Sequence, residues 1–358
     1  MDEMKLSEFY SNEKLRSVSV DKLKFWLMPF VYFTLLGFPT RFGGYVSILS
    51  NFAAPAFFIL CGFLNLVPDS DTRLKKVKKA LKRSLIIFLV MLLSYIAINL
   101  AYLAFTDSLN SSLASEIFRK RIAFNFLALN IWVPLPMGSS IWFIHSLFYA
   151  YVFFFIAERF KLSKLYIPLF VLLCVVMLAT GEFAAFLKFP HFGYNYIPSG
   201  AITRAIPYMI LGMIIRKHID KIGKINRYWF AALFFAGLAL SFAEMTVLYR
   251  LGMLIYKGHN IGMGVMAVSV CCYALVNPVV LKRNFYANHG RKYAIRLYAF
   301  CQPVSLMIFI VGPFLYPPFI IYFHQFSSLV TFAVSFLIAL IIGVIKYTIF
   351  SKKKARKF

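Results

Sequence analysis

Ten long apolar runs constrain this chain more than any other feature of its sequence. A helix rises about 1.5 Å per residue and the hydrocarbon core of a bilayer is about 30 Å thick, so most runs are long enough to cross it. In lipid, only helices and closed barrels satisfy every backbone polar group, and the runs lack the alternating pattern of barrel strands. We therefore predict an all-α polytopic membrane protein with about ten transmembrane helices. The runs cover residues 25–40, 46–67, 84–106, 140–157, 165–184, 199–215, 228–248, 260–281, 297–316 and 327–350.

Composition and length leave little sequence for a separate soluble domain. Hydrophobic residues make up 61% of the chain, charged residues make up 15%, and the mean hydropathy is +0.75. Soluble domains are closer to half apolar and a quarter charged. We predict one integral-membrane domain over residues 1–358, with a cytoplasmic arm at 1–24 and a basic cytoplasmic tail at 351–358. The first run lacks a small-residue cleavage pattern, which indicates a retained helix.

The loops between the runs alternate between rich and poor in Lys and Arg. Of the 39 basic residues, 30 lie on the side of the two termini, seven lie in the opposite loops, and two lie inside runs. By the positive-inside rule, this distribution places both termini in the cytoplasm. Topology and contact with anionic membrane lipids therefore account for the net charge of +26, and no nucleic-acid partner is predicted.

The chain offers no residue pattern typical of a metal site. Its five cysteines all fall inside apolar runs, without CxxC or Cys–His spacing. No two of its six histidines have metal-ligand spacing on one predicted helix. We predict no metal, and packing as the default role of the cysteines.

Four short strings carry a family resemblance. They read PAFFILCGF at residues 55–63, IWFIHSL at 141–147, IPYMILGM at 206–213 and YAFCQPV at 298–304. In this order, on ten spans with both ends inside, they resemble the acyltransferase-3 family of membrane O-acyltransferases. The Lys82-Arg83 pair follows the second span, as a basic pair does in the family. The resemblance implies a multi-pass protein of a bacterial inner (plasma) membrane that transfers an acyl group.

The chain also departs from the family pattern at positions linked to proton transfer. The family carries a basic residue at the start of its first span and a His about eleven residues later. Lys24 matches the basic residue, whereas Leu35 stands at the His position. Cys61 replaces a Ser in the second span, and Cys301 stands where the late string often has His. A family member without catalytic activity is therefore the main alternative.

Acyl transfer from a thioester to a sugar hydroxyl needs a base, groups that stabilise the oxyanion, and a basic mouth for coenzyme phosphates. Polar residues within the runs fall at two depths that suit these needs. Near the outer ends we predict His145 as base, with Glu182 and Arg204 as orienting or acceptor-binding groups. Near the cytoplasmic ends we expect acyl-CoA to be bound by Lys24, Lys82, Arg83, Cys301 and Gln302. The competing interpretation is that such residues anchor the helices at the interface or pack in the bundle.

The leading functional interpretation is an O-acyltransferase that moves an acetyl group from acyl-CoA, a co-substrate and not a bound cofactor, to a surface or lipid-linked glycan. Two alternatives come from other classes. One is a degenerate family member that binds or scaffolds partners in glycan assembly. The other is a transporter for lipid-linked sugars, whose helices would be discontinuous in paired halves. Loop 107–139 is predicted to form a re-entrant or surface helix at 122–136 over the outer mouth.

Overall fold

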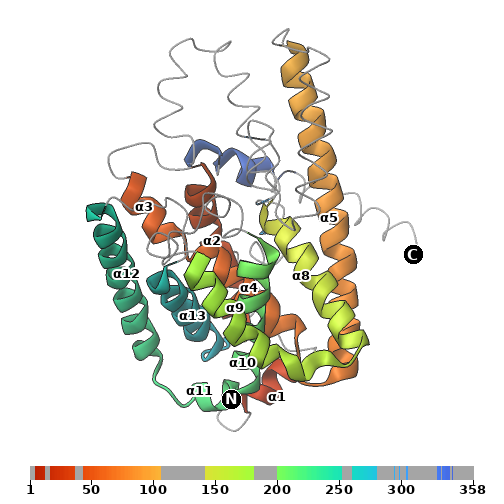
Figure 1. Ribbon diagram of the computed structural model, residues 1–358, viewed down its shortest axis with the longest axis vertical. Coiled ribbons are helices and arrows are strands. Elements are labelled where there is room, and N and C mark those ends of the chain that lie inside the picture. Colours follow the sequence, from red (N-terminus) through yellow and green to blue (C-terminus); the bar gives the residue numbers. More distant parts are fainter. Residues whose placement is uncertain are drawn as a thin grey trace, which may run out of the picture.

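The computed structural model describes residues 5–12, 17–36, 43–105, 142–180, 200–251 and 260–279, with isolated positions at 294, 298, 304, 329–331, 333–338 and 341. The described segments form helices without a strand among them (Figure 1). These helices are α1 (Leu6–Ser11), α2 (Val18–Leu36), α3 (Gly43–Ser50), α4 (Ala53–Asn65), α5 (Ser70–Phe105), α8 (Trp142–Arg159), η3 (Leu162–Leu165), α9 (Tyr166–Thr180), η5 (Ala201–Ala205), α10 (Ile206–Lys217), α11 (Ile219–Ile222), α12 (Arg227–Arg250) and α13 (Ile261–Leu275).

The first eight predicted spans coincide with these helices, which confirms the all-helical prediction for the described part of the chain. Three helical regions differ from expectation. The first helix of the bundle, α2, begins at Val18 and not at residue 25, and the second predicted span is divided into α3 and α4 around Asn51. Helix α5 begins at Ser70 and not at residue 84, so the basic segment 73–83 that was expected between two spans is helical. The ninth and tenth predicted spans and loop 107–139 lie largely or wholly outside the described residues, so the number of spans stays a prediction.

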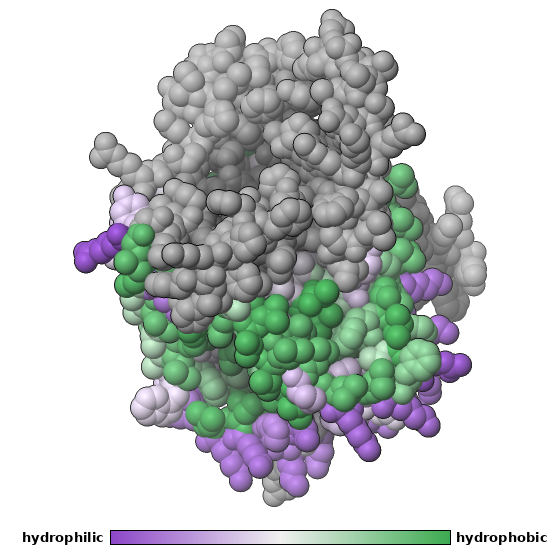
Figure 2. All heavy atoms as spheres, viewed as in Figure 1, coloured by the Kyte–Doolittle hydropathy of each residue, from purple (hydrophilic) through white to green (hydrophobic). Residues whose placement is uncertain are grey.

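The lateral surface of the bundle, which runs along the helices, is apolar over several of them. Within the described residues, three helical stretches are long and apolar enough to cross a membrane: Gly43–Asn65, Leu162–Ala179 and Arg227–Arg250. On α9, for example, Val171, Leu172 and Val175 are each more than half exposed. Figure 2 shows a green apolar band across the described surface and hydrophilic side chains along the lower edge, where α1 and α11 lie in Figure 1. Large exposed apolar surfaces are rare on soluble monomers, so this belt fits contact with lipid.

Local sequence explains where several helices begin. Asn226 and Asn260 precede α12 and α13, and their side chains accept hydrogen bonds from the backbone N–H groups of Tyr228 and Met263. Asp69 accepts a hydrogen bond from the backbone of Thr72 at 2.8 Å, at the start of α5. Asn and Asp are favoured there because the first N–H groups of a helix have no partner within it.

Helix α4 lies at the centre of the bundle and packs against α2, α10 and α13. Nine of its 13 residues are buried. A Cβ atom added at Gly62 would lie 2.0 Å from the Met209 carbonyl oxygen, and one added at Gly212 would lie 2.1 Å from the Ile59 carbonyl oxygen. Small residues allow such close backbone contact between membrane helices, so these two glycines set the α4–α10 distance.

The predicted cytoplasmic arm contains a short helix, α1, that is bonded to the end of the bundle. The Ser7 backbone N–H donates to Asp220 Oδ1 at 2.9 Å. Hydrogen bonding by the Ser7 side chain, assisted by this backbone bond, lowers the pKa of the Asp220 carboxyl. The Tyr10 hydroxyl donates to the Leu275 carbonyl oxygen at 2.9 Å. The buried Arg216 guanidinium donates to the Tyr10 carbonyl oxygen and stacks on the Tyr10 ring. The arm is therefore part of the folded bundle and not a loose tail.

Candidate functional site

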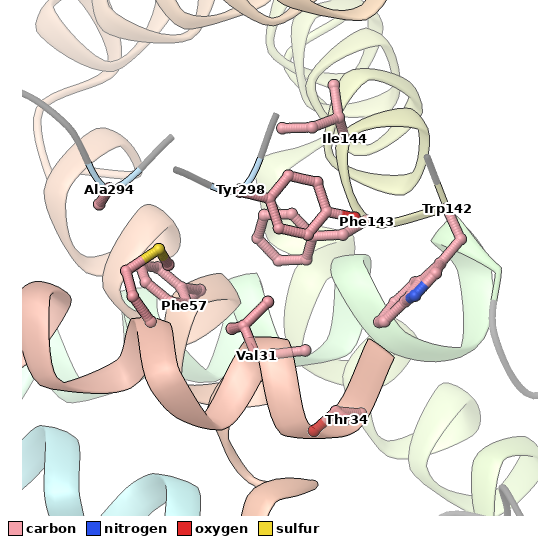
Figure 3. Close-up of a pocket in the computed structure, with 10 residues that line it drawn as sticks. Val31, Thr34, Phe57, Trp142, Phe143, Ile144, Ala294 and Tyr298 are labelled. Atoms are coloured by element: carbon pink, nitrogen blue, oxygen red, sulfur yellow. The ribbon is translucent and has the colours of Figure 1, made fainter. Parts of the chain in front are cut away.

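An apolar cavity lies between α2, α4 and α8. It provides about 30 Å³ of space for the centre of a water-sized sphere. Figure 3 shows Val31 and Thr34 facing Phe143 and Tyr298 across this space, with Trp142 on one side and Phe57 on the other. The Thr34 hydroxyl donates to the Phe30 carbonyl oxygen at 2.9 Å, so it is already bonded. The lining residues are Met28, Val31, Thr34, Ala54, Phe57, Trp142, Phe143, Ile144, Ala294 and Tyr298.

The cavity faces of the three helices continue toward a group of polar side chains. On a helix, residues three or four positions apart lie on the same face. One turn beyond the cavity residue Met28 on α2 stands Lys24, and one turn beyond Phe57 on α4 stands Cys61. On α8 the same face runs from Ile144 through Leu147 to Tyr151. The helix faces that line the cavity therefore carry Lys24, Cys61 and Tyr151 one or two turns farther along.

Cys61 and Tyr151, together with Asn65 at the end of α4, form what we call the polar cluster. The Asn65 side-chain amide donates to the Tyr151 hydroxyl and to the Cys61 carbonyl oxygen, both at 2.9 Å. The Tyr151 hydroxyl also lies within hydrogen-bond reach of the Cys61 thiol. Lys24 and Arg83 are both close enough to act electrostatically on that thiol. Beyond the apolar cavity, the same helices thus carry hydrogen-bonding groups on which two basic side chains act electrostatically, an arrangement suited to an amphipathic, anionic ligand.

The predicted coenzyme-binding residues divide into three sets. Lys24 on α2 and Arg83, an exposed residue of α5, both act electrostatically on the Cys61 thiol. Lys24 also pairs with Asp21 at 3.7 Å. Lys82 is an exposed residue of α5. Cys301 and Gln302 lie outside the described residues.

The predicted base, His145, is fully buried on α8 and is not among the residues that line the cavity. Its ring lies 5.7 Å from that of Phe88 on α5 and 4.5 Å, edge to face, from that of Tyr149. The cavity is lined instead by Trp142, Phe143 and Ile144, the three residues that precede it. His145 therefore packs between α5 and α8, and its catalytic role stays a prediction.

Arg204 lies in η5, a short π-helical turn, with its guanidinium 5.1 Å from the centre of the Trp142 ring. Arginine over a tryptophan face is a favourable cation–π contact. This contact connects Arg204 to a residue of the cavity wall. Its predicted partner Glu182 lies outside the described residues. Glu244 on α12 accepts a hydrogen bond from the Gly262 backbone N–H at 3.1 Å, near the start of α13.

Sequence reasoning did not identify a buried ion pair at the predicted cytoplasmic end of the bundle. Arg73 Nε lies 2.7 Å from Glu158 Oε1, and the Tyr166 hydroxyl donates to the same oxygen at 2.6 Å. Arg73 Nη1 also donates to the Val67 and Pro68 carbonyl oxygens. Arg73 had been counted only as one of the basic topology residues. Nothing in the sequence signals the pair, because its members are 85 positions apart, on α5 and α8.

Among the described residues, no group of three or more His, Cys, Asp or Glu side chains is arranged to hold a metal ion. The polar cluster was also missed. Cys61 was noted for its place in a family string, whereas Tyr151 is one of 21 tyrosines and had no distinguishing signal.

Comparison with known proteins gives one match. The family described as an acyltransferase domain, of the acyltransferase-3 type, matches residues 19–348. No curated protein and no solved structure matches the chain.

Proposed function

Because the chain belongs to the acyltransferase-3 family, we propose that it is a membrane O-acyltransferase that moves an acetyl group from acyl-CoA to a sugar hydroxyl of a surface or lipid-linked glycan. The family match over residues 19–348 carries this proposal, because it includes every cavity-lining residue and the polar cluster. The predicted location of the protein is a bacterial inner membrane, and its acyl-CoA donor is cytosolic.

The donor end of the site is proposed at Lys24, Lys82 and Arg83, with Cys301 and Gln302 on the late string. Coenzyme A carries several phosphates, and charge-assisted hydrogen bonds to phosphate are stronger than neutral ones. The closeness of Lys24 and Arg83 to the Cys61 thiol supports this assignment. His145 is the proposed base, with Glu182 and Arg204 as orienting or acceptor-binding groups.

The test is acyl transfer by the detergent-purified full chain, with radiolabelled acetyl-CoA as donor and cell-envelope glycan fractions as acceptors. Arg83→Ala should weaken acetyl-CoA binding by about tenfold to a hundredfold, since a charged hydrogen-bond partner is lost. Added salt should reduce the difference. The matched control is Lys164→Ala, an exposed basic residue between α8 and α9, which should bind the donor normally. Equal affinity in both variants would mean that Arg83 contributes only to the charge asymmetry that sets topology.

A second candidate function is a family member that has lost catalysis and binds or scaffolds partners in glycan assembly. The observation in its favour is Leu35 at the position where the family carries its first-span His. Mass spectrometry of surface glycans from cells with and without the gene separates the two. An acyl group that disappears with the gene, and returns with wild-type protein, supports the enzyme. If glycan acylation is unchanged while glycan assembly fails, the scaffold is the better assignment.

A further inference from the structure

We propose that the apolar cavity between α2, α4 and α8 holds the acyl group of the donor and admits only short acyl chains, with Trp142 closing the end away from the coenzyme. This inference rests on the proposed function. It assigns to Trp142 a role in acyl-chain specificity that neither the family match nor the sequence motifs assign.

The lining of the cavity indicates what can occupy it. A sugar would bring several hydroxyl groups, and polar groups buried without hydrogen-bond partners are strongly disfavoured. The cavity wall is apolar, and its one aliphatic hydroxyl, on Thr34, already donates to the Phe30 carbonyl oxygen. A hydrocarbon group is therefore the matching ligand, which argues against the acceptor glycan as occupant.

The size of the cavity limits the length of that hydrocarbon group. One water molecule needs about 10–15 Å³ of such space, and this cavity provides about 30 Å³. That is room for about two or three heavy atoms. An acetyl or propionyl group fits, whereas a lipid tail does not.

The orientation of the cavity along the helices indicates where the coenzyme part of the donor would lie. Its inner end, at Met28 and Phe57, continues by one helical turn to Lys24 and Cys61. Its other end is formed by Thr34, Ala54 and Trp142, ten residues or about 15 Å along α2 from Lys24. A donor with its phosphates near Lys24 and Arg83 would therefore direct its acyl end toward Trp142.

Trp142 is contacted on two sides. Arg204 stacks over its ring at 5.1 Å, and the Phe143 ring lies edge to face with it at 6.0 Å. A longer acyl chain would have to break these contacts in order to displace the partly exposed ring from the end of the cavity.

The experiment measures competitive binding of acetyl-, propionyl-, butyryl- and hexanoyl-CoA, and of free coenzyme A, to the purified full chain. Wild-type protein should lose affinity sharply beyond propionyl. Trp142→Ala should raise butyryl affinity relative to acetyl by about tenfold or more, the range for one methylene in an apolar pocket. Ala54→Leu, which fills the same end, should act oppositely and reduce acetyl-CoA affinity toward that of free coenzyme A. Trp229→Ala, an exposed tryptophan of α12, is the matched control and should leave every ratio unchanged.

Two outcomes separate this inference from the proposed function. Acyl transfer with the same chain-length preference in wild type, Trp142→Ala and Ala54→Leu overturns the cavity assignment and leaves the enzyme assignment standing. Absence of both acyl-CoA binding and acyl transfer in wild-type protein overturns both.

Discussion

At the scale of single residues, the Arg73–Glu158 pair carries the largest expected effect on stability. Both side chains are buried, and the Tyr166 hydroxyl completes the environment of the carboxylate. A buried charge that loses its partner is strongly destabilising, whereas replacing both members by apolar groups is often nearly neutral.

Glu158→Leu should therefore lower the free energy of unfolding by about 3–5 kcal/mol, because it leaves the Arg73 guanidinium buried without its counter-charge. Adding Arg73→Met to Glu158→Leu should recover most of that loss. The measurement is the denaturation midpoint of purified protein in detergent, with exposed Arg159→Met as the control. If the double variant is as unstable as Glu158→Leu, the unpaired Arg73 charge is not the cause of the lost stability.

His145 gives the second prediction at this scale. If it is the base, His145→Ala and His145→Gln should each lower acyl transfer by about two to four powers of ten, because neither replacement titrates near neutral pH. Its location between Phe88 and Tyr149 supplies the competing role, packing between α5 and α8. Transfer rates are measured on protein shown to be folded by its elution profile in detergent. Full activity in both variants removes His145 from the mechanism.

At the scale of helices, the α4–α10 contact decides how the polar cluster is presented. Gly62 and Gly212 bring the two backbones close enough that neither tolerates a Cβ atom without movement. The same helix, α4, carries Phe57 of the cavity and Cys61 of the cluster. A shift of α4 would therefore disturb packing and donor binding together.

Gly212→Ala should destabilise the protein by about 1–3 kcal/mol, the usual range for an overpacked contact, and weaken acetyl-CoA binding as α4 is displaced. Gly44→Ala is the matched control, since a Cβ atom there meets nothing within 4 Å and alanine favours the helix. Denaturation midpoints and donor affinities are compared for the two variants. Equal behaviour would mean that the glycine contact does not hold α4 in place.

At the scale of the whole molecule, the orientation in the membrane is the main prediction. The distribution of 30 basic residues on one side and seven on the other predicts cytoplasmic termini. In intact cells, cysteines introduced at positions 76 and 354 should be protected from an impermeant thiol reagent, and one introduced at 112 should react. Labelling after membrane permeabilisation is the control for reactivity. Reaction of position 76 from outside would exclude the ten-span arrangement.

The helices themselves were predictable because lipid leaves the backbone so few choices. An apolar run must satisfy its own N–H and C=O groups, so its composition and length alone place a helix on it. The helices at the first eight predicted spans follow from this rule. The family was predictable for another reason, because the strings that carry the resemblance are local in sequence. The start of α2 at Val18 was missed because the residues before position 25 are largely polar. Hydrogen bonds fix this part of the helix: the Val18 N–H donates to the Val279 carbonyl oxygen, and the Val20 N–H donates to the Ser17 hydroxyl.

The sequence by itself determined the helical fold class, the charge asymmetry and the family. The tertiary structure alone decided which faces meet. It brought Lys24 and Tyr151, from two other helices, within interaction range of Cys61, and it placed the His145 ring beside that of Phe88. It also paired Arg73 with Glu158. The physical reason is that the rotation of each helix about its axis depends on packing against its neighbours. Close contacts such as those at Gly62 and Gly212 set that packing, and no local pattern of residues encodes it.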